Sequence, residues 1–279
     1  MKLKISHIES PSRRLKAVSF ACALSAIAPL TAHAALVVNT SNDANTLVSS
    51  ILGSGITLVS GSESYLGANL GASGTFSGGG SIGGTGLGFD SGLLLTTGNA
   101  VGAIGPNNVS NYSGSGAYTE LAFSFTTAGG NLFFNYVFAS EEYNEYVGSQ
   151  FNDSFRFLLD GTNIALIPST TTPVSINNVN LGSNSPYYRN NAPGPFTGLQ
   201  YDGLTTVLTA QALGLSAGTH TIRLIIEDVG DSSWDSGVFI QGNSFSDVQT
   251  PTGVPDAAST LGLLIAGLGA VTVARRRKS

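Results

Sequence analysis

Apolar and polar side chains alternate along much of the chain, which is the pattern of strands with one buried face. The run from Glu120 to Thr126 places Leu121, Phe123 and Phe125 on one side of an extended segment. The run from Asn131 to Ala139 is more uniformly apolar, as expected of a central strand. Further strands are predicted at residues 92–98, 154–159, 174–179, 207–210, 219–227 and 237–245. The fold class is therefore predicted to be all-β, a β-sandwich or jelly-roll-like single domain.

One short helix is predicted near the start of this domain, at residues 43–52. Asp43 can cap its first turn, and Leu47, Val48 and Ile51 form an apolar stripe that ends before a glycine. The stripe is of the kind that packs on a core, so the helix is given a purely structural role.

Two segments are predicted to be loops. Residues 67–92 contain 11 glycines in 26 positions, and this glycine content predicts a flexible surface loop. The segment has no lysine and does not open a helix, so it is not interpreted as a phosphate-binding loop. Residues 183–203 are rich in Asn, Pro, Tyr and Gly and are predicted to form a long loop of the kind that often carries binding function.

The N-terminus has the pattern of a secretory signal peptide at residues 1–34. A basic stretch reaches Lys16, an apolar run follows from Ala17 to Leu30, and Ala32-His33-Ala34 is a small-x-small cleavage site. Cleavage is expected between Ala34 and Ala35, after export by the Sec machinery, with signal peptidase as the enzyme. The alternative is an uncleaved anchor, but the apolar run is shorter than the ~20 residues of a membrane span.

The C-terminus has three parts: a linker with a polar motif at residues 250–256, an apolar helix at 257–274 and a basic tail at 275–279. It resembles the PEP-CTERM class of sorting signals, in the variant that begins Val-Pro-Asp. The motif residues are Val254, Pro255, Asp256, Ser259 and Thr260. The resemblance implies a Gram-negative bacterium, a transient inner-membrane anchor and an exosortase-type membrane sorting enzyme as partner. The usual pattern has Pro-Glu-Pro, so the identity of the matching enzyme stays open, as does an ordinary single-pass anchor.

Charge is unevenly distributed along the chain. Between residues 35 and 255 there is no lysine, and three arginines face 15 acids, a formal charge of −12. Such a body repels phosphate backbones, which excludes nucleic acid as a partner. The one cysteine, Cys22, lies in the signal peptide, and His220 is the one histidine of the body, so disulfides and zinc sites are not expected.

Acidic residues gather in two segments, at residues 138–154 and 227–236, each just past a strongly apolar strand. If the two loops converge, carboxylates within ~6 Å would repel each other, and a bound Ca²⁺ would remove that repulsion. The candidate Ca²⁺ ligands are Glu141, Glu142, Asp153, Asp228, Asp231 and Asp235. The alternative is a pair of solvated acidic loops, and the spacing does not match an EF-hand loop.

These segments also carry a family resemblance. The runs at residues 138–143 with 152–153, 201–205 and 228–239, together with the early strand at 94–98, look like the choice-of-anchor L domain. The resemblance covers most of residues 36–246, within a domain placed at 35–249. It implies a surface-exposed bacterial domain with no established activity, and so it supplies no catalytic residues.

The preferred hypothesis is a non-catalytic protein of the cell surface or extracellular matrix, with Ca²⁺-dependent adhesion or glycan binding and extracellular polysaccharide as a partner. Loop aromatics are candidates for stacking on sugar rings, although such residues more often pack over a sheet edge. They are Tyr143, Tyr146, Tyr187, Tyr188 and Trp234.

The alternative is a secreted carboxylate-dependent glycoside hydrolase, in which Glu142 would act with Asp231 or Asp235. A Ser-His-Asp hydrolase is not favoured, because His220 lies within an alternating strand and no Gly-x-Ser-x-Gly motif occurs.

Overall fold

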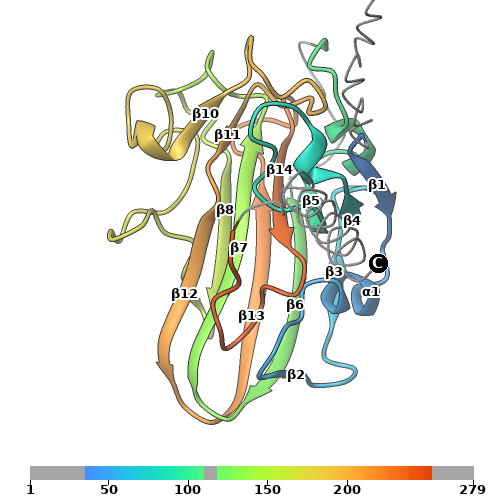
Figure 1. Ribbon diagram of the computed structural model, residues 1–279, viewed down its shortest axis with the longest axis vertical. Helices are drawn as coiled ribbons and strands as arrows, with labels where there is room; N and C mark the ends of the chain where they lie inside the picture. The colour runs from blue at the N-terminus through green and yellow to red at the C-terminus, as the bar shows by residue number, and fades with distance from the viewer. Residues whose placement is uncertain (1–34, 110–117, 253–279) are drawn as a thin grey trace, which may run out of the picture. The chain divides into compact units, whose positions relative to one another are not determined.

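The computed structural model describes residues 35–109 and 118–252, which form two antiparallel sheets packed face to face (Figure 1). The first sheet contains β1 (Val37–Thr40), β4 (Ser73–Ser77), β5 (Gly92–Thr96), β14 (Ser236–Gln241), β7 (Gly130–Ser140), β11 (Gly203–Thr205) and β10 (Tyr188–Asn190) in this order, and β12 (Leu208–Leu215) also pairs with β7. The second contains β2 (Ile56–Leu58), β6 (Tyr118–Thr127), β13 (Gly218–Glu227), β8 (Ser154–Leu159) and β9 (Thr162–Asn163), and β3 (Ser64–Leu66) also pairs with β6. The predicted all-β sandwich is confirmed.

One α-helix occurs in the described part of the chain, α1 (Ala44–Ser49), with short 3₁₀ turns at Gly79–Ser81, Ala100–Ala103 and Ser185–Tyr187. Asp43 caps α1 as predicted, because its carboxylate accepts a hydrogen bond of 3.0 Å from the Thr46 amide. No helix of the described residues is long and apolar enough to cross a membrane. The predicted signal peptide and the predicted C-terminal helix lie outside these residues.

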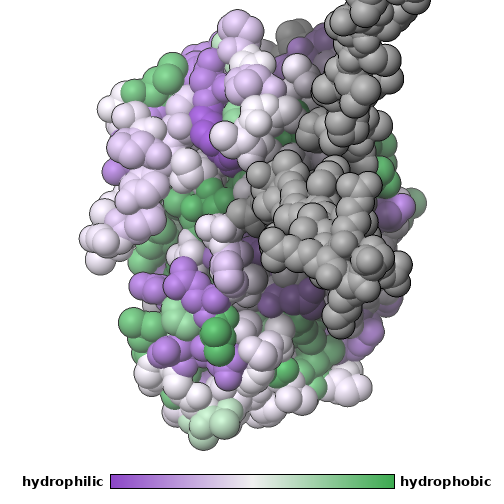
Figure 2. Space-filling model, in the orientation of Figure 1, coloured by the Kyte–Doolittle hydropathy of each residue, from purple (hydrophilic) through white to green (hydrophobic). Residues whose placement is uncertain are grey.

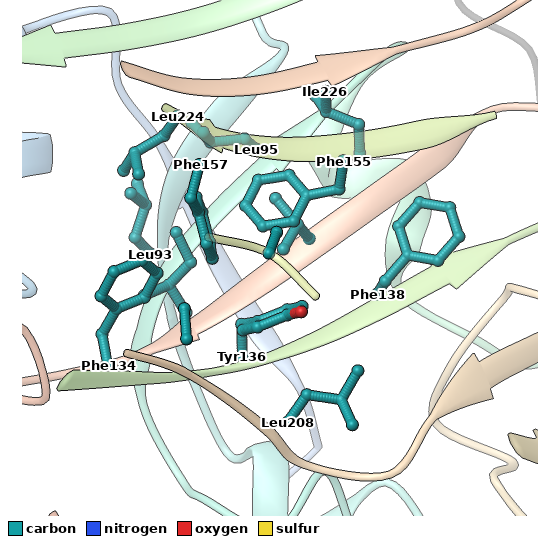
Figure 3. Packing of buried hydrophobic residues seen from close by; sticks show 14 of the residues in the cluster. Leu93, Leu95, Phe134, Tyr136, Phe138, Phe155, Phe157, Leu208, Leu224 and Ile226 are labelled. Carbon is teal, nitrogen blue, oxygen red and sulfur yellow. The ribbon is translucent and has the colours of Figure 1, made fainter. Parts of the chain in front are cut away.

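The main core lies between the sheets (Figure 3). Phe134, Tyr136 and Phe138 of β7 point inward at every second position, and the rings of Phe134 and Tyr136 contact Phe155 and Phe157 of β8. On β6 the predicted face is equally buried, with Leu121, Phe123 and Phe125 at most 2% exposed. Period-two patterning thus determines which face of each long strand packs against the other sheet.

A second, smaller core covers the outer face of the first sheet. It joins Val137 of β7, Phe239 of β14 and Phe76 of β4 to Phe89 and Phe196 from the segments outside the strands of this sheet. The prediction of a flexible loop at residues 67–92 is therefore wrong, because this segment forms β4, a 3₁₀ turn and part of this core. Its apolar residues are buried between the glycines, and their burial offsets the entropy that ordering the glycines costs.

The predicted strand at residues 174–179 is also wrong. Val174, Ile176 and Val179 are fully buried, as the apolar pattern indicated, but the segment forms turns. The Asn178 side chain donates to the carbonyl of Pro173 and that of Asn180 to the carbonyl of Ile176, both at 3.0 Å. These local bonds satisfy carbonyls that a strand would present to a neighbour.

Exposed large apolar side chains are scattered over several elements. They are Val37, Leu66, Leu70, Val101, Val109, Leu181, Leu213 and Val248. Figure 2 shows hydrophobic patches interspersed with hydrophilic ones on the face that it draws. Scattered exposure of this kind is ordinary and needs no partner to explain it.

The direction of the long strands determines where the acidic loops lie. Short turns join β6 to β7 and β12 to β13 at the lower end of Figure 1. Consequently β7 and β13 both end at the opposite end, where β8 and β14 begin. The register shows this directly, because Ser140 pairs with Ser236 and Glu227 pairs with Ser154. Both predicted acidic segments therefore emerge at one end of the sandwich.

Candidate functional site

Backbone and side-chain hydrogen bonds join the two acidic segments. Asp153, just before β8, accepts bonds from the Val229 amide at 2.9 Å and from the Ser236 hydroxyl at 2.6 Å. The Glu141 amide donates to the carbonyl of Asp235 at 3.1 Å. The predicted convergence of the loops after β7 and β13 is thus present in the structure.

Five of the six predicted ligand residues are buried. Glu141, Asp153 and Asp235 are 0% exposed, Glu142 is 1% exposed and Asp228 is 4% exposed. Asp231 alone among the six is exposed to solvent. The alternative of two solvated acidic loops therefore does not describe this end of the sandwich.

Burial and mutual repulsion raise the pKa of the two glutamates that follow β7. Burial raises the pKa of Glu141 to about 9, and the charge of Asp202 adds to the rise, while the Gln200 side chain opposes it in part. Burial raises the pKa of Glu142 to about 8, with the charge of Asp153 contributing next. Both shifts have the sign expected of carboxylates taken out of water beside like charges.

The aspartates from the other strands behave in the same way. Burial raises the pKa of Asp153 to about 7, against the opposing effect of its hydrogen bonds from Ser236 and Val229. Burial raises the pKa of Asp228 to about 9, and the charges of Asp153 and Asp231 add to the rise. Burial thus destabilises the charged form of both aspartates, and a bound cation would offset that destabilisation.

Several buried carboxylate oxygens accept no hydrogen bond. Both oxygens of Asp228 and Oε2 of Glu142 have no partner in the described structure. The three arginines of the described ranges are engaged elsewhere: Arg156 pairs with Glu227, Arg223 pairs with Glu120, and Arg189 donates to backbone carbonyls. No arginine of the described ranges therefore neutralises Asp228 or Glu142, and no donor reaches either oxygen of Asp228 or Oε2 of Glu142.

The acids do not form a closed set of metal ligands as they are placed. Among the described residues, no group of three or more His, Cys, Asp or Glu side chains has the arrangement of a metal site. The predicted Ca²⁺ site remains a prediction at this point.

A groove of about 310 Å³ opens beside the buried acids. Its lining comes from four loops: Asn107, Asn108, Val109, Glu145, Ala192, Asp202 and Trp234. The Asn107 amide donates at 2.6 Å to Asp202 and at 3.1 Å to the carbonyl of Asn191, which fixes one wall. Burial raises the pKa of Asp202.

Sequence reasoning missed the roles of Asn107 and Asp202. Both lie outside the two acidic segments, and neither sits in a charged run. One signal was present, because Asp202 lies in the run at residues 201–205 that carries the family resemblance. Its place near Glu141 depends on the pairing of β11 with the end of β7, which no local pattern indicates.

The aromatic candidates separate into two groups. Tyr143 is 0% exposed and Tyr188 is 8% exposed, with their ring centroids 4.8 Å apart, so neither can stack on a sugar. Tyr187 packs against the main core. Tyr146 makes an edge contact of 5.1 Å with Trp234, and among these five aromatics Trp234 is the one that lines the groove.

The residues predicted for a hydrolase, Glu142 with Asp231 or Asp235, lie outside the groove lining. Glu142 and Asp235 are buried, and Asp231 is exposed. The sorting motif and the signal cleavage residue Ala34 lie outside the described residues, and Ala35 begins the described chain.

Comparisons with known proteins give one family and one distant structure. A family model described as the Choice-of-anchor L domain matches residues 36–246. A solved structure of a family 35 carbohydrate binding module from an environmental isolate is 14% identical, and the match covers 56% of this chain and 90% of that chain with a TM-score of 0.21. No curated protein matches the chain. The low TM-score means that the structural match carries no argument.

Proposed function

The chain belongs to the choice-of-anchor L family, and from that premise we propose a non-catalytic protein exported to the surface or extracellular matrix of a Gram-negative bacterium, where it binds a glycan. The observation that carries the binding proposal is the groove between the loops, which combines one large aromatic side chain with amides and carboxylates.

This combination suits a sugar ring. Trp234 offers a broad apolar face with a polar edge, and Asn107 and Asn108 offer amide donors and acceptors. Glu145 and Asp202 can accept hydrogen bonds from sugar hydroxyls. The bonds of Asn107 to Asp202 and to the Asn191 carbonyl hold part of this surface before a ligand arrives, which limits the ordering cost of binding.

The route to the surface is part of the proposal. The signal peptide of residues 1–34 would engage the Sec machinery and signal peptidase, and the Val254-Pro255-Asp256 motif would engage an exosortase-type enzyme. The acidic, lysine-free body supports a location outside the cytoplasm. Extracellular polysaccharide is then the proposed binding partner.

Glycoside hydrolysis is the second candidate, on one specific observation. Glu145 and Asp202 both line the groove, and burial raises the pKa of Asp202, as a general acid requires. This pair differs from the one that the sequence indicated, Glu142 with Asp231 or Asp235.

Binding of the exported protein to a glycan array and to purified extracellular polysaccharide tests the main proposal. Trp234→Ala should weaken binding at least tenfold, because stacking on an aromatic ring would be lost. Leu213→Ala is the matched control, since this exposed residue lies on β12 outside the groove. A blank array and unretarded protein on the polysaccharide would refute glycan binding.

Turnover of the bound polysaccharide separates the two candidates. Asp202→Asn keeps an oxygen for the Asn107 amide but loses one acceptor for sugar hydroxyls, so in a binding module it should weaken binding without abolishing it. Release of reducing ends by the wild type, lost in Asp202→Asn, would establish the hydrolase instead.

The sorting proposal has a separate test. Cells that express the chain with and without residues 254–256 should differ in the size and location of the product. Identical size and location in both strains would refute processing at this motif.

A further inference from the structure

The carboxylates of Glu142, Asp153, Asp228 and Asp231 form what we call the acidic cluster, and its members come from three separate strand ends. Glu142 follows β7, Asp153 precedes β8, and Asp228 and Asp231 follow β13. Each lies within electrostatic range of others in the cluster: Asp228, for example, is affected by the charges of Asp153, Asp231 and Glu142. The architecture therefore gathers four acids that are distant in sequence.

Unpartnered buried oxygens distinguish this cluster from an ordinary acidic surface. Asp228 is 4% exposed and neither of its oxygens accepts a hydrogen bond, and Oε2 of Glu142, at 1% exposed, also lacks a partner. A buried acceptor without a donor destabilises the fold, and it does so more strongly when it is charged. These oxygens have free lone pairs and are already shielded from water, so a cation could bind them without first displacing a hydrogen-bond donor.

We propose that the acidic cluster binds one Ca²⁺ ion, with Glu142, Asp153, Asp228 and Asp231 as its protein ligands. The proposal goes beyond glycan binding and does not depend on it.

The chemistry of the cluster selects Ca²⁺ among the common metals. All four side chains offer hard oxygen ligands, and none is a thiolate or an imidazole, the ligands favoured by zinc and copper. Ca²⁺ accepts roughly six to eight oxygens at ~2.3–2.6 Å in irregular geometry, which a set of loops from three strands can supply. Mg²⁺ demands near-ideal octahedral geometry and gives up its waters reluctantly, so it should bind more weakly.

Binding requires the loop after β13 to move. The described acids are not at mutual ligand spacing as they are placed, so one wall of the site must close on the others. Asp231 is the exposed member, and it directly follows Gly230, whose φ of +108° gives the loop a backbone conformation that other residues rarely adopt. We assign Asp231 as the ligand that closes over Glu142, Asp153 and Asp228 when the ion enters.

Closure at Asp231 also reaches the groove. Trp234 lies three residues further along the same loop and lines the groove, and Asp235 follows it into the buried layer. Trp234 is the one tryptophan of the chain, so its fluorescence reports on this loop alone. An ion in the cluster should therefore change that fluorescence without any glycan present.

The test uses the full exported protein, stripped with a chelator and dialysed. Calcium chloride alone should give a saturable heat in titration calorimetry, a change in Trp234 fluorescence and a rise in Tm of about 5–10 °C at a hundredfold excess of Ca²⁺ over its Kd. Terbium should give Trp234-sensitised luminescence that Ca²⁺ displaces. The absence of both the heat and the terbium signal would overturn the proposal.

Two isosteric variants locate the site. Asp228→Asn and Glu142→Gln should each weaken Ca²⁺ binding at least tenfold. Asp90→Asn is the matched control, because Asp90 is an exposed acid on a different segment, where it accepts a bond from the Gly80 amide. Equal Ca²⁺ affinity in wild type and both cluster variants would overturn the ligand assignment. Should one variant fail to fold, the other decides the matter, and terbium binding to the wild type is independent of both.

The outcomes separate this proposal from glycan binding. Calcium binding with a blank glycan array would leave the metal site standing and refute the proposed function. Glycan binding that persists in chelator, with no calcium heat, would do the opposite.

Discussion

Arg189→Ala should release the glycine-rich segment from the face of the first sheet. The Arg189 guanidinium donates to the carbonyl of Thr205 at 2.5 and 2.9 Å and to the carbonyl of Gly86 at 2.7 Å. It also lies 5.2 Å from the centre of the Phe196 ring. One side chain thus ties residues 85–87 to the strand pair β10–β11.

The magnitude follows from what is lost and what is relieved. Three bonds from a charged donor contribute roughly 1.5 kcal/mol each, and the contact with Phe196 contributes roughly 0.5–1 kcal/mol. Burial of the guanidinium, which lowers the pKa of Arg189 to about 10, opposes this stabilisation. The net destabilisation of Arg189→Ala is therefore about 2–3 kcal/mol, or a fall in Tm of roughly 4–12 °C for a domain of this size. Arg189→Lys should lose about half as much, because an ammonium cannot reach both carbonyls with a planar fork.

Urea unfolding followed by circular dichroism measures the free energy, and hydrogen exchange locates the change. The amide of Leu87 donates to the carbonyl of Gly79 at 2.8 Å, so its protection should fall in Arg189→Ala while that of β13 stays close to the global value. Arg223→Ala is the matched control, since its exposed pair with Glu120 should contribute less than about 1 kcal/mol. A stability of Arg189→Ala within about 0.5 kcal/mol of wild type, with unchanged exchange at residues 79–88, would refute the reasoning.

Three further expectations concern the scaffold. Phe157→Ala should lower the free energy of unfolding in urea by about 3–5 kcal/mol. The Phe157 ring is fully buried, and its centroid lies 4.2 Å from that of Phe134 and 5.0 Å from that of Tyr136. A loss below about 1 kcal/mol would contradict a core between the sheets. Asn191→Ala should lower Tm by several degrees, since its buried side-chain amide accepts from the Phe196 amide at 3.0 Å and donates to the carbonyl of Tyr201 at 2.9 Å. An unchanged Tm would show that these bonds do not stabilise the loop at residues 191–201. Hydrogen bonds to Asp160 and to the carbonyl of Ser216 raise the pKa of His220, so the stabilisation from its charged form is full below about pH 6.5 and is lost as the pH rises through the raised pKa of the folded state. Melts should therefore show wild type losing up to about 1 kcal/mol of stability relative to His220→Gln as the pH rises through this range. Parallel curves of stability against pH for the two proteins would contradict the pairing.

The long strands could be predicted from the sequence because a period of two determines which face is buried. Leu121, Phe123 and Phe125 are buried as the alternation required. The cap at Asp43 could be predicted for a similar reason, since a local hydrogen bond to Thr46 decides it. In each case the energy that decides the structure comes from residues that are neighbours in sequence.

The glycine-rich segment could not be predicted in this way. A Cβ atom at Gly79 would lie 2.5 Å from the carbonyl oxygen of Phe89, and at Gly83, where φ is +93°, it would clash with the carbonyl of Pro195. These glycines permit close approach of backbones, within the segment at Gly79 and to a distant loop at Gly83, whereas glycine content alone indicates flexibility. Only the tertiary contacts distinguish the two uses.

The site was predictable in part. Two acidic runs, each following a long apolar strand, indicated that the acids would gather at strand ends, and antiparallel topology brought them to one end. The burial of Glu141 and Asp228 could not be predicted, because charged loop residues are usually solvated. The groove residues Asn107 and Asp202 depended on the pairing of β11 with β7, which no local pattern determines.

The scaffold and the acidic cluster are separable in energetic terms. The sheets are held together by a core of apolar side chains. Both carboxylate oxygens of Asp228 and Oε2 of Glu142 accept no hydrogen bond from the scaffold. In the ion-free protein Asp228 must either take up a proton on folding or carry a charge beside Asp153 and Asp231, and an amide of the same shape avoids both costs, so Asp228→Asn should keep or raise the stability of the ion-free protein. Acids that cost the fold stability and provide no internal pairing are explained more readily by a cation that joins them than by the fold itself.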